Sequence, residues 1–421
     1  MKKTRRADAE TRPNVLSRRT ALAAAGSTLS AAMAGCLGLG SIGGTDLSAA
    51  FSRQWQGSTQ TDYGHNHHDF AVVEGNEPII VAPHSSQTGS QDCGFHATDA
   101  AGSDAWRGEV DPEFCTPHAV GDVGVGTRNG TTEVFGGTEA GELRGFVAET
   151  GEETLRLDIL GSMGYSAPIV AVFTGNEPEV IVADFQGGVF AVDTDSTVIW
   201  EHDFDGQISA SPLCAPLVDD SEPQLAVAHG RRSDAAVSVR DASGESVWST
   251  AVDGITRSRM TTARDDGGHD LIVGAGSSAH RLAGATGERQ WTESFDETVY
   301  LGAIVDGSVI VGSNDGYIRS LDVADGSTVW EAQVVSGDET RLTAPAVGEL
   351  HGDGERQIVA TTYDETVVAL DTAGGLLARY DLGVPSYVSP QCVDLTGDGA
   401  EAVVVMDGTG RLTALGFESS E

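Results

Sequence analysis

A motif that recurs along nearly the whole chain constrains the fold most. Each intact copy is a short turn that ends in glycine, with a tryptophan four residues later. Three copies keep both parts: Asp99 to Gly102 with Trp106, Asp241 to Gly244 with Trp248, and Gly284 to Gly287 with Trp291. Such self-similarity indicates one fold built from equal units rather than several unrelated domains.

The remaining copies are altered but keep the spacing. Trp200 and Trp330 follow changed turns, Leu155 and Ala378 replace the aromatic after an intact turn, and Trp55 stands near the N-terminus. The eight positions lie 39 to 51 residues apart, which is the period of a four-stranded propeller blade. We expect six tryptophans to be structural, each wedged between neighbouring blades rather than stacking on a ligand: Trp55, Trp106, Trp200, Trp248, Trp291 and Trp330.

The rest of the pattern is all-β. Short β-branched runs at 179–183, 269–273 and 402–406 recur between Gly, Asp and Asn turns, and helical periodicity is almost absent. The last repeat has no tryptophan strand of its own, and residues 50–55 can supply it. The sequence therefore predicts an eight-bladed β-propeller of four-stranded antiparallel blades at 49–418, closed by its N- and C-terminal strands, with a tail at 419–421.

The N-terminal segment predicts export and lipid anchorage. Residues 1–35 read as a signal peptide in which Arg18 and Arg19 resemble a twin-arginine export signal. Cys36 ends a lipobox-like sequence, and residues 36–48 would be the lipidated cysteine and a flexible linker. These features predict a protein held by lipid on the extracellular side of the cytoplasmic membrane.

Charge limits the choice of partner and environment. Beyond residue 35 the chain has 18 basic side chains, all arginine, and 61 acidic ones, a formal charge of −43. A lysine-free acidic surface is typical of proteins from extreme halophiles, because molar salt screens its self-repulsion. The same charge repels nucleic acid, so we expect no nucleic-acid partner.

Repeated Ala-x-Asp-x-x-x-Gly-x-x-x-Trp variants over residues 50–418 resemble the PQQ-type propeller repeat. One branch of that family consists of dehydrogenases that hold pyrroloquinoline quinone and calcium, typically beneath an adjacent Cys-Cys disulfide. Here no two of the five cysteines are adjacent. The resemblance is therefore to the non-enzymatic branch, which includes the barrel-assembly lipoprotein.

This resemblance implies a membrane-anchored binding or scaffold protein for a protein partner or small ligand. It implies no cofactor. The alternative is an oxidoreductase that uses pyrroloquinoline quinone, calcium or another metal at the channel mouth. No nucleophile, base and acid can be assigned from linear spacing.

The strand nearest the axis follows each tryptophan strand, so the residues that enter it should line one channel mouth, the default ligand site. These candidate rim residues are Tyr63, His65, His67, His68, Asp69, His118, Tyr165, Arg257, Arg259, Tyr300, Arg341 and Tyr387.

Two stretches suggest metal ligands. On a strand, His65, His67 and Asp69 would share one face and could bind zinc or copper, although they could equally be hydrogen-bonding rim residues. Asp394 and Asp398 lie in a stretch similar to calcium loops, or in a plain Asp/Gly hairpin turn.

The cysteines beyond the signal fall into two pairs. Cys93 and Cys115 lie on neighbouring blades near one rim and can form a disulfide in an exported protein. Cys214 and Cys392 occupy equivalent inner-strand positions four blades apart, too distant to be bridged.

Overall fold

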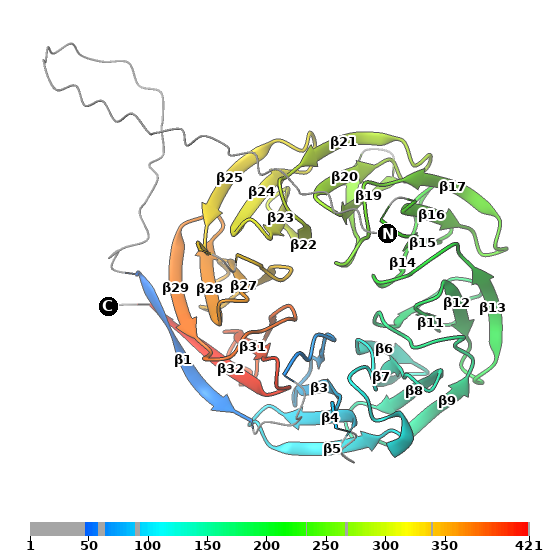
Figure 1. Ribbon diagram of the computed structural model, residues 1–421, viewed down its shortest axis with the longest axis horizontal. Helices are drawn as coiled ribbons and strands as arrows, with labels where there is room; N and C mark the ends of the chain where they lie inside the picture. Colours follow the sequence, from blue (N-terminus) through cyan, green and yellow to red (C-terminus); the bar gives the residue numbers. More distant parts are fainter. Residues whose placement is uncertain are drawn as a thin grey trace, which may run out of the picture. The chain divides into compact units, whose positions relative to one another are not determined.

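The computed structural model describes residues 47–57, 64–88, 93–232, 234–265, 268–337 and 340–419. They form eight four-stranded antiparallel sheets, arranged as blades around a central axis (Figure 1). The only helix in these ranges is the short 3-10 helix η1 (Pro112–Phe114). None of the described residues therefore forms a helix that could cross a membrane. The prediction of an all-β, eight-bladed propeller is confirmed.

Each blade runs from an innermost strand at the axis to an outermost strand at the perimeter. The innermost strands are β2 (Ala71–Val73), β6 (Gly124–Arg128), β10 (Ile169–Ala171), β14 (Leu213–Ala215), β18 (Thr261–Asp265), β22 (Val299–Val305), β26 (Ala346–Gly348) and β30 (Gln391–Val393). The second strands are β3 (Ile79–His84), β7 (Thr131–Gly137), β11 (Glu179–Ala183), β15 (Gln224–His229), β19 (Gly268–Ala275), β23 (Ser308–Ser313), β27 (Gln357–Thr361) and β31 (Ala402–Met406). The third strands are β4 (Gly94–Asp99), β8 (Glu142–Val147), β12 (Gly188–Val192), β16 (Ala236–Arg240), β20 (Ser278–Leu282), β24 (Tyr317–Asp322), β28 (Thr366–Asp371) and β32 (Leu412–Ser419). The outermost strands are β5 (Asp104–Glu109), β9 (Glu153–Asp158), β13 (Val198–Asp203), β17 (Ser246–Ala251), β21 (Arg289–Ser294), β25 (Thr328–Gln333), β29 (Leu376–Asp381) and β1 (Ala49–Gln56).

The two ends of the propeller share one blade. Strand β1 pairs antiparallel with β32, with Phe51 opposite Phe417 and Trp55 opposite Ala414. Figure 1 shows β1 as the outermost strand beside β32. The N-terminal strand thus supplies the fourth strand of the last blade, as the missing tryptophan strand predicted, and β32 extends to Ser419, into the predicted tail.

The tryptophan of one blade packs on the turn glycine of the next. A Cβ atom added to Gly102 would lie 2.7 Å from the Trp55 ring, and one added to Gly151 would lie 2.6 Å from Trp106. The indole nitrogens of Trp55 and Trp106 donate hydrogen bonds to backbone carbonyls in the same turns. Turn glycine and tryptophan are therefore two sides of one blade interface. The core lies between the blades, where the second and third strands are buried on both faces.

Candidate functional site

The loops that enter the innermost strands surround one end of the central channel, called the mouth below. Most rim residues predicted from the sequence lie on these loops or at the first residues of the strands, and Tyr63 lies outside the described residues. Along the chain they enter the blades as follows: His65, His67, His68 and Asp69 before β2; His118 before β6; Tyr165 before β10; Arg257 and Arg259 before β18; Tyr300 in β22; Arg341 before β26; Tyr387 before β30.

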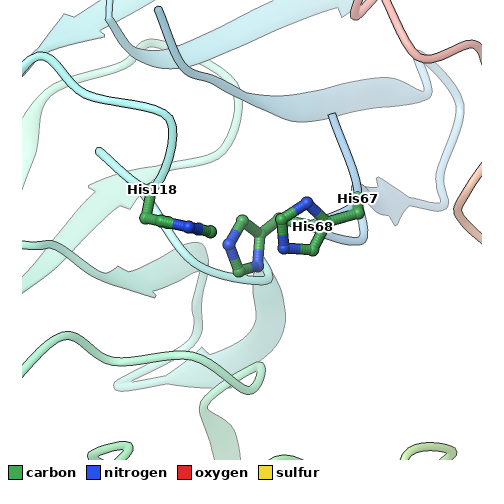
Figure 2. A group of neighbouring side chains, drawn as sticks. All are labelled: His67, His68 and His118. Atoms are coloured by element: carbon green, nitrogen blue, oxygen red, sulfur yellow. The ribbon is translucent and has the colours of Figure 1, made fainter. Parts of the chain in front are cut away.

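Three histidines from two neighbouring blades cluster on one side of the mouth. The ring centroid of His67 lies 4.5 Å from that of His68 and 5.3 Å from that of His118. Tyr165, from the next blade, lies 4.8 Å from His68. Figure 2 shows the His118 ring pointing towards His68, with His67 on the other side. At least one ligand nitrogen of each imidazole lies within 4.8 Å of the others.

Asp122 joins the three blades that carry this cluster. Its Oδ1 accepts hydrogen bonds from Nδ1 of His68 and from the backbone N–H of Asp69, each 3.0 Å long. Its own backbone N–H donates to the carbonyl of Tyr165 at 3.0 Å. One residue therefore connects the first three loops, through its side chain and its backbone N–H. Asp122 was not predicted from the sequence, because its only signal is an aspartate between glycine and valine just before an inner strand.

Burial lowers the pKa of His67 and His68 and raises that of two nearby carboxyl groups. Desolvation, followed by the neighbouring imidazoles, lowers the pKa of His67 to about 4 and that of His68 to about 3. Desolvation raises the pKa of Asp69 to about 7, with the Asp122 charge adding to the effect, and it raises the pKa of Asp122 to about 7 as well. Arg259 opposes both increases.

Tyrosines line another part of the mouth. The Tyr363 ring lies 4.9 Å from Tyr387, and the Arg341 guanidinium lies 4.9 Å above Tyr363. Tyr387 in turn contacts His65, with 5.2 Å between the rings. Burial raises the pKa of Tyr165 and of Tyr363 to about 12, so both hydroxyls stay protonated and can donate hydrogen bonds. Tyr363 was missed because it lies in the hairpin between β27 and β28, not before an innermost strand.

Two exposed arginines, Arg257 and Arg259, complete the mouth. Within the described part of the chain neither guanidinium forms a hydrogen bond or a close ion pair. Arg259 is within electrostatic range of Asp69 and Asp122, and Arg257 is within range of Tyr165. The mouth of this strongly acidic protein thus carries two exposed positive charges.

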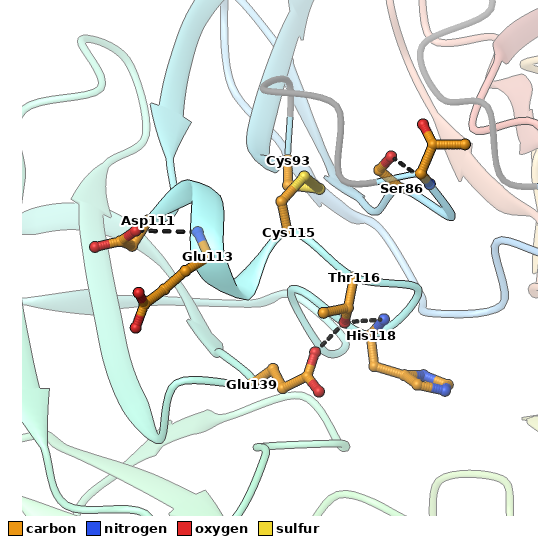
Figure 3. The surroundings of a disulfide bond; sticks show 9 residues. Ser86, Cys93, Asp111, Glu113, Cys115, Thr116, His118 and Glu139 are labelled. Atoms are coloured by element: carbon orange, nitrogen blue, oxygen red, sulfur yellow. Dashed lines mark hydrogen bonds between the residues drawn. A yellow bond between two sulfur atoms is a disulfide. The ribbon is translucent and has the colours of Figure 1, made fainter.

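A disulfide holds the loop that carries His118. Cys93 and Cys115, the pair suggested by the sequence, are bonded with a Cα–Cα distance of 5.4 Å. Figure 3 shows the bond beside Thr116, whose hydroxyl accepts from the backbone N–H of His118 and donates to the Glu139 carboxylate. The disulfide and the hydrogen bonds of Thr116 therefore restrain the loop just before His118.

The expected zinc or copper face of His65, His67 and Asp69 is wrong in its geometry. Residues 64–70 form turns and bends, and strand β2 begins only at Ala71. The side chains of these residues therefore do not alternate between two faces as they would along a strand. The histidine cluster takes in His68 and His118 instead, and the Asp69 carboxylate accepts a hydrogen bond from the backbone of Ser389.

The calcium-like stretch lies beyond the far end of β30 and behaves as a turn. Asp394 accepts hydrogen bonds from the backbone N–H groups of Gly397 and Gly399, and Asp398 accepts one from Ala400. The loop borders a cavity of about 390 Å³, but both carboxylates already bind backbone. Cys214 and Cys392 are free thiols in the middle of β14 and β30.

Comparison with known proteins supports the repeat type. A family model described as outer membrane protein assembly factor BamB matches residues 233–420. Over these residues the chain is similar to the PQQ-type propeller repeat. A search of curated proteins finds no match to this propeller.

Solved structures share the propeller fold at low identity. BamB from Moraxella catarrhalis is 18% identical, with a TM-score of 0.61, and the match covers 88% of this chain and 99% of that one. The computationally designed Ika8 protein is 14% identical, with a TM-score of 0.62 and coverages of 84% and 98%. Quinohemoprotein alcohol dehydrogenase from Comamonas testosteroni is 14% identical, with a TM-score of 0.64 and coverages of 87% and 76%.

The residues of this propeller do not match the quinone site that the dehydrogenase branch implies. That site typically uses an adjacent Cys-Cys disulfide, whereas the disulfide here joins residues 22 positions apart. It connects two loops of neighbouring blades and holds His118 in place. We therefore derive no reaction through a quinone.

Proposed function

We propose that this propeller is a non-enzymatic binding protein of the cell envelope, and that a partner protein docks an acidic segment at the mouth. The observation that carries the proposal is the pair of exposed guanidinium groups of Arg257 and Arg259, which have no close ion pair within the described residues and share the mouth with tyrosine rings. Such a surface offers forked donors for carboxylates and aromatic faces for packing.

Several arginines elsewhere in the chain are held in close ion pairs. Arg128 is buried in an ion pair with Glu133, and Arg281 is paired with Asp270, each at 2.8 Å. Within the described residues Arg257 and Arg259 form no such close ion pair, although the chain as a whole has a net charge of −38. Positive charge at the mouth would favour encounter with an acidic partner segment, and the surrounding acidic surface would restrict docking to that place.

The side chains at the mouth suit binding better than acid–base catalysis. The Tyr165 and Tyr363 hydroxyls retain their protons, because burial raises the pKa of each to about 12. The two free thiols lie on innermost strands rather than in the mouth loops, and burial raises the pKa of Cys214 to about 12, so this thiol is not an activated nucleophile. The similarity to the protein named BamB supports a scaffold role in the envelope.

Anchorage is the second part of the proposal and rests on the sequence. Arg18, Arg19 and Cys36 lie outside the described residues, and they suggest export followed by lipid attachment on the outer face of the cytoplasmic membrane. Cys36→Ser should release the protein into the medium or leave it unprocessed. Fractionation of cells that make each form tests this, and a variant that is processed and membrane-bound like the wild type contradicts anchorage through Cys36.

Site-specific photocrosslinking tests the docking site. A photoreactive phenylalanine analogue replaces Tyr300 at the mouth, and in a second chain it replaces Val329, which is 58% exposed on the outermost strand β25. We expect a discrete crosslinked protein from position 300 and none from position 329. Equal products from both positions contradict docking at the mouth.

The charge requirement has a matched control. Arg257→Gln with Arg259→Gln removes two positive charges from the mouth, and Arg231→Gln with Arg232→Gln removes two from the β15–β16 turn. That turn is on the same side of the ring, because Gly230 pairs with Gln207, which precedes β14. Only the first double variant should lose the crosslink from position 300. If the Arg257 and Arg259 double variant retains the crosslink, these two arginines do not bind the partner.

A further inference from the structure

We propose that His67, His68 and His118 bind one divalent transition-metal ion, of the zinc and copper class, at the mouth. Their ligand nitrogens lie within 4.8 Å of one another and come from two adjacent blades (Figure 2). Imidazole nitrogen suits zinc, copper and nickel, whereas calcium and magnesium require oxygen ligands. The inference is independent of the proposed function, because an ion can bind whether or not a partner docks.

Hydrogen bonds orient two of the rings for metal binding. Nδ1 of His67 lies 2.9 Å from the carbonyl oxygen of His65, which can only accept, so Nδ1 carries the proton and Nε2 carries the lone pair. Nδ1 of His68 bonds to Oδ1 of Asp122, which already accepts from the backbone of Asp69. That oxygen is therefore an acceptor, and Nε2 of His68 also keeps its lone pair. A carboxylate or carbonyl behind a ligating histidine is the usual outer-shell arrangement of metal sites.

Two nitrogens of the cluster are buried without a hydrogen-bond partner. These are Nε2 of His68, whose side chain is fully buried, and Nδ1 of His118, and neither finds a partner among the described residues. Buried polar atoms in proteins nearly always have one. A metal ion at this point would satisfy the lone pair of the His68 nitrogen, and His118 could serve through either ring nitrogen.

The surroundings support a site that closes on an ion with little movement. His68 is held by Asp122, and the loop of His118 is held by the Cys93–Cys115 disulfide (Figure 3). His67 and His118 are only partly buried, so their rings can turn by the roughly 1 Å needed for zinc–nitrogen distances of about 2.0–2.1 Å. Three protein ligands leave a fourth position for water or for a group of the partner.

Zinc titration by calorimetry tests the site, with the purified chain carrying no polyhistidine tag. Cobalt absorption gives a second readout, because Co²⁺ bound by four ligands absorbs strongly in the visible range. We expect one ion per chain. His118→Gln and His67→Gln should each weaken zinc binding by about 100-fold, since outer-shell changes alone typically cost 10–100-fold.

His65→Gln is the matched control. His65 lies in the same loop and at the same mouth but is not in the cluster, so its variant should bind zinc within about twofold of wild type. Melting curves of the metal-free proteins check that all three variants are folded. Absence of a one-to-one complex in the wild type overturns the proposal, and so does equal zinc affinity in the His118 and His65 variants.

Discussion

Buried histidines couple the stability of the propeller to pH, and His280 is the clearest case away from the mouth. It is fully buried in β20, its Nδ1 lies 2.9 Å from the Thr292 hydroxyl, and burial lowers its pKa from 6.5 to about 4, with Arg289 contributing. The folded state therefore binds fewer protons than the unfolded state between these values. Its contribution is fully present above pH 6.5 and is lost as the pH falls towards 4.

We predict that His280→Gln weakens this acid sensitivity. Between pH 7 and pH 4.5 the wild type should lose roughly 2–3 kcal/mol of unfolding free energy more than the variant does. Denaturant titrations at the two pH values measure the difference. His269→Gln, on the neighbouring strand β19 and only half-buried, should behave like the wild type. Parallel pH profiles for the His280 variant and the wild type would refute the assignment.

Turn glycines at the blade interfaces adopt a positive φ and leave space for a tryptophan ring, and two substitutions can separate these effects. Gly102 has a φ of +81° and leaves no room for a Cβ atom, which would meet the Trp55 ring at 2.7 Å. Gly354 has a φ of +86° but nothing within 4 Å. Alanine at either position costs about 1–2 kcal/mol, because a positive φ strains its backbone. Only alanine at 102 also clashes with a packed ring, which costs about 1–3 kcal/mol more.

Gly102→Ala should therefore unfold at clearly lower denaturant concentration than Gly354→Ala. Chemical denaturation of the two variants and the wild type in high salt gives the comparison. Equal free energies of unfolding for the two variants would mean that the Trp55 ring moves aside at no cost. The turn glycines would then be needed only for their backbone conformation.

These residues also show what the sequence could reveal. The repeat disclosed that Gly102 forms a turn and that Trp55 fills a blade interface, because both signals are local. The contact between Gly102 and Trp55 joins two blades, so the spacing within one repeat does not predict it. Asp122 was missed for the same reason, because its partners His68 and Tyr165 belong to the neighbouring blades.

At the scale of single elements, strand β1 closes the ring. It pairs with β32 over residues 49–56, Phe51 packs against Phe417 with 5.2 Å between the rings, and Trp55 reaches the first blade through its bond to Ala100. Deleting residues 37–48 removes only the predicted linker and should leave the melting temperature unchanged. Deleting residues 37–56 opens the ring, exposes the edge of β32 and removes a large aromatic, at a cost of about 3 kcal/mol or more.

Melting experiments on the two deletions in high salt measure the difference. Equal melting temperatures would show that the propeller does not depend on β1.

The pairing of β1 with β32 was predictable because the last repeat lacked a tryptophan strand and the N-terminus carried an unmatched one. The loop at 64–70 was misread as a strand because alternating histidines imitate strand periodicity, whereas hydrogen bonds such as that of His68 to Asp122 hold it in an irregular path.

At the scale of the whole molecule, the fold could be predicted but the role of the mouth could not. Eight spaced repeats suffice to define a closed ring, since each blade needs neighbours on both sides to bury its faces. The mouth is assembled from loops that share no motif, and its chemistry depends on which side chains meet across the axis. Partner and ligand therefore have to be sought by experiment at His67, His118, Arg257 and Arg259.

The charge of the whole chain leads to a prediction about salt. The net charge is −38, and the part beyond residue 35 has no lysine. Lowering the salt from about 1 M to about 0.1 M lengthens the Debye length from roughly 3 Å to roughly 10 Å, so that neighbouring surface carboxylates repel one another. We expect a melting temperature lower by about 10 °C or more at 0.1 M, equivalent to several kcal/mol for a domain of this size.

Salt also strengthens hydrophobic burial, so a control must separate this effect from screening. Sucrose at the osmolality of the high-salt buffer is excluded from the protein surface but does not screen charge. If screening is the cause, sucrose should restore only a small part of the lost melting temperature, whereas sodium chloride and potassium chloride should restore it equally. The buried pair of Arg128 and Glu133 is shielded from solvent and should add little to the salt dependence. A melting temperature that does not change with salt, or that sucrose restores fully, would rule out surface self-repulsion as a determinant of stability in this propeller.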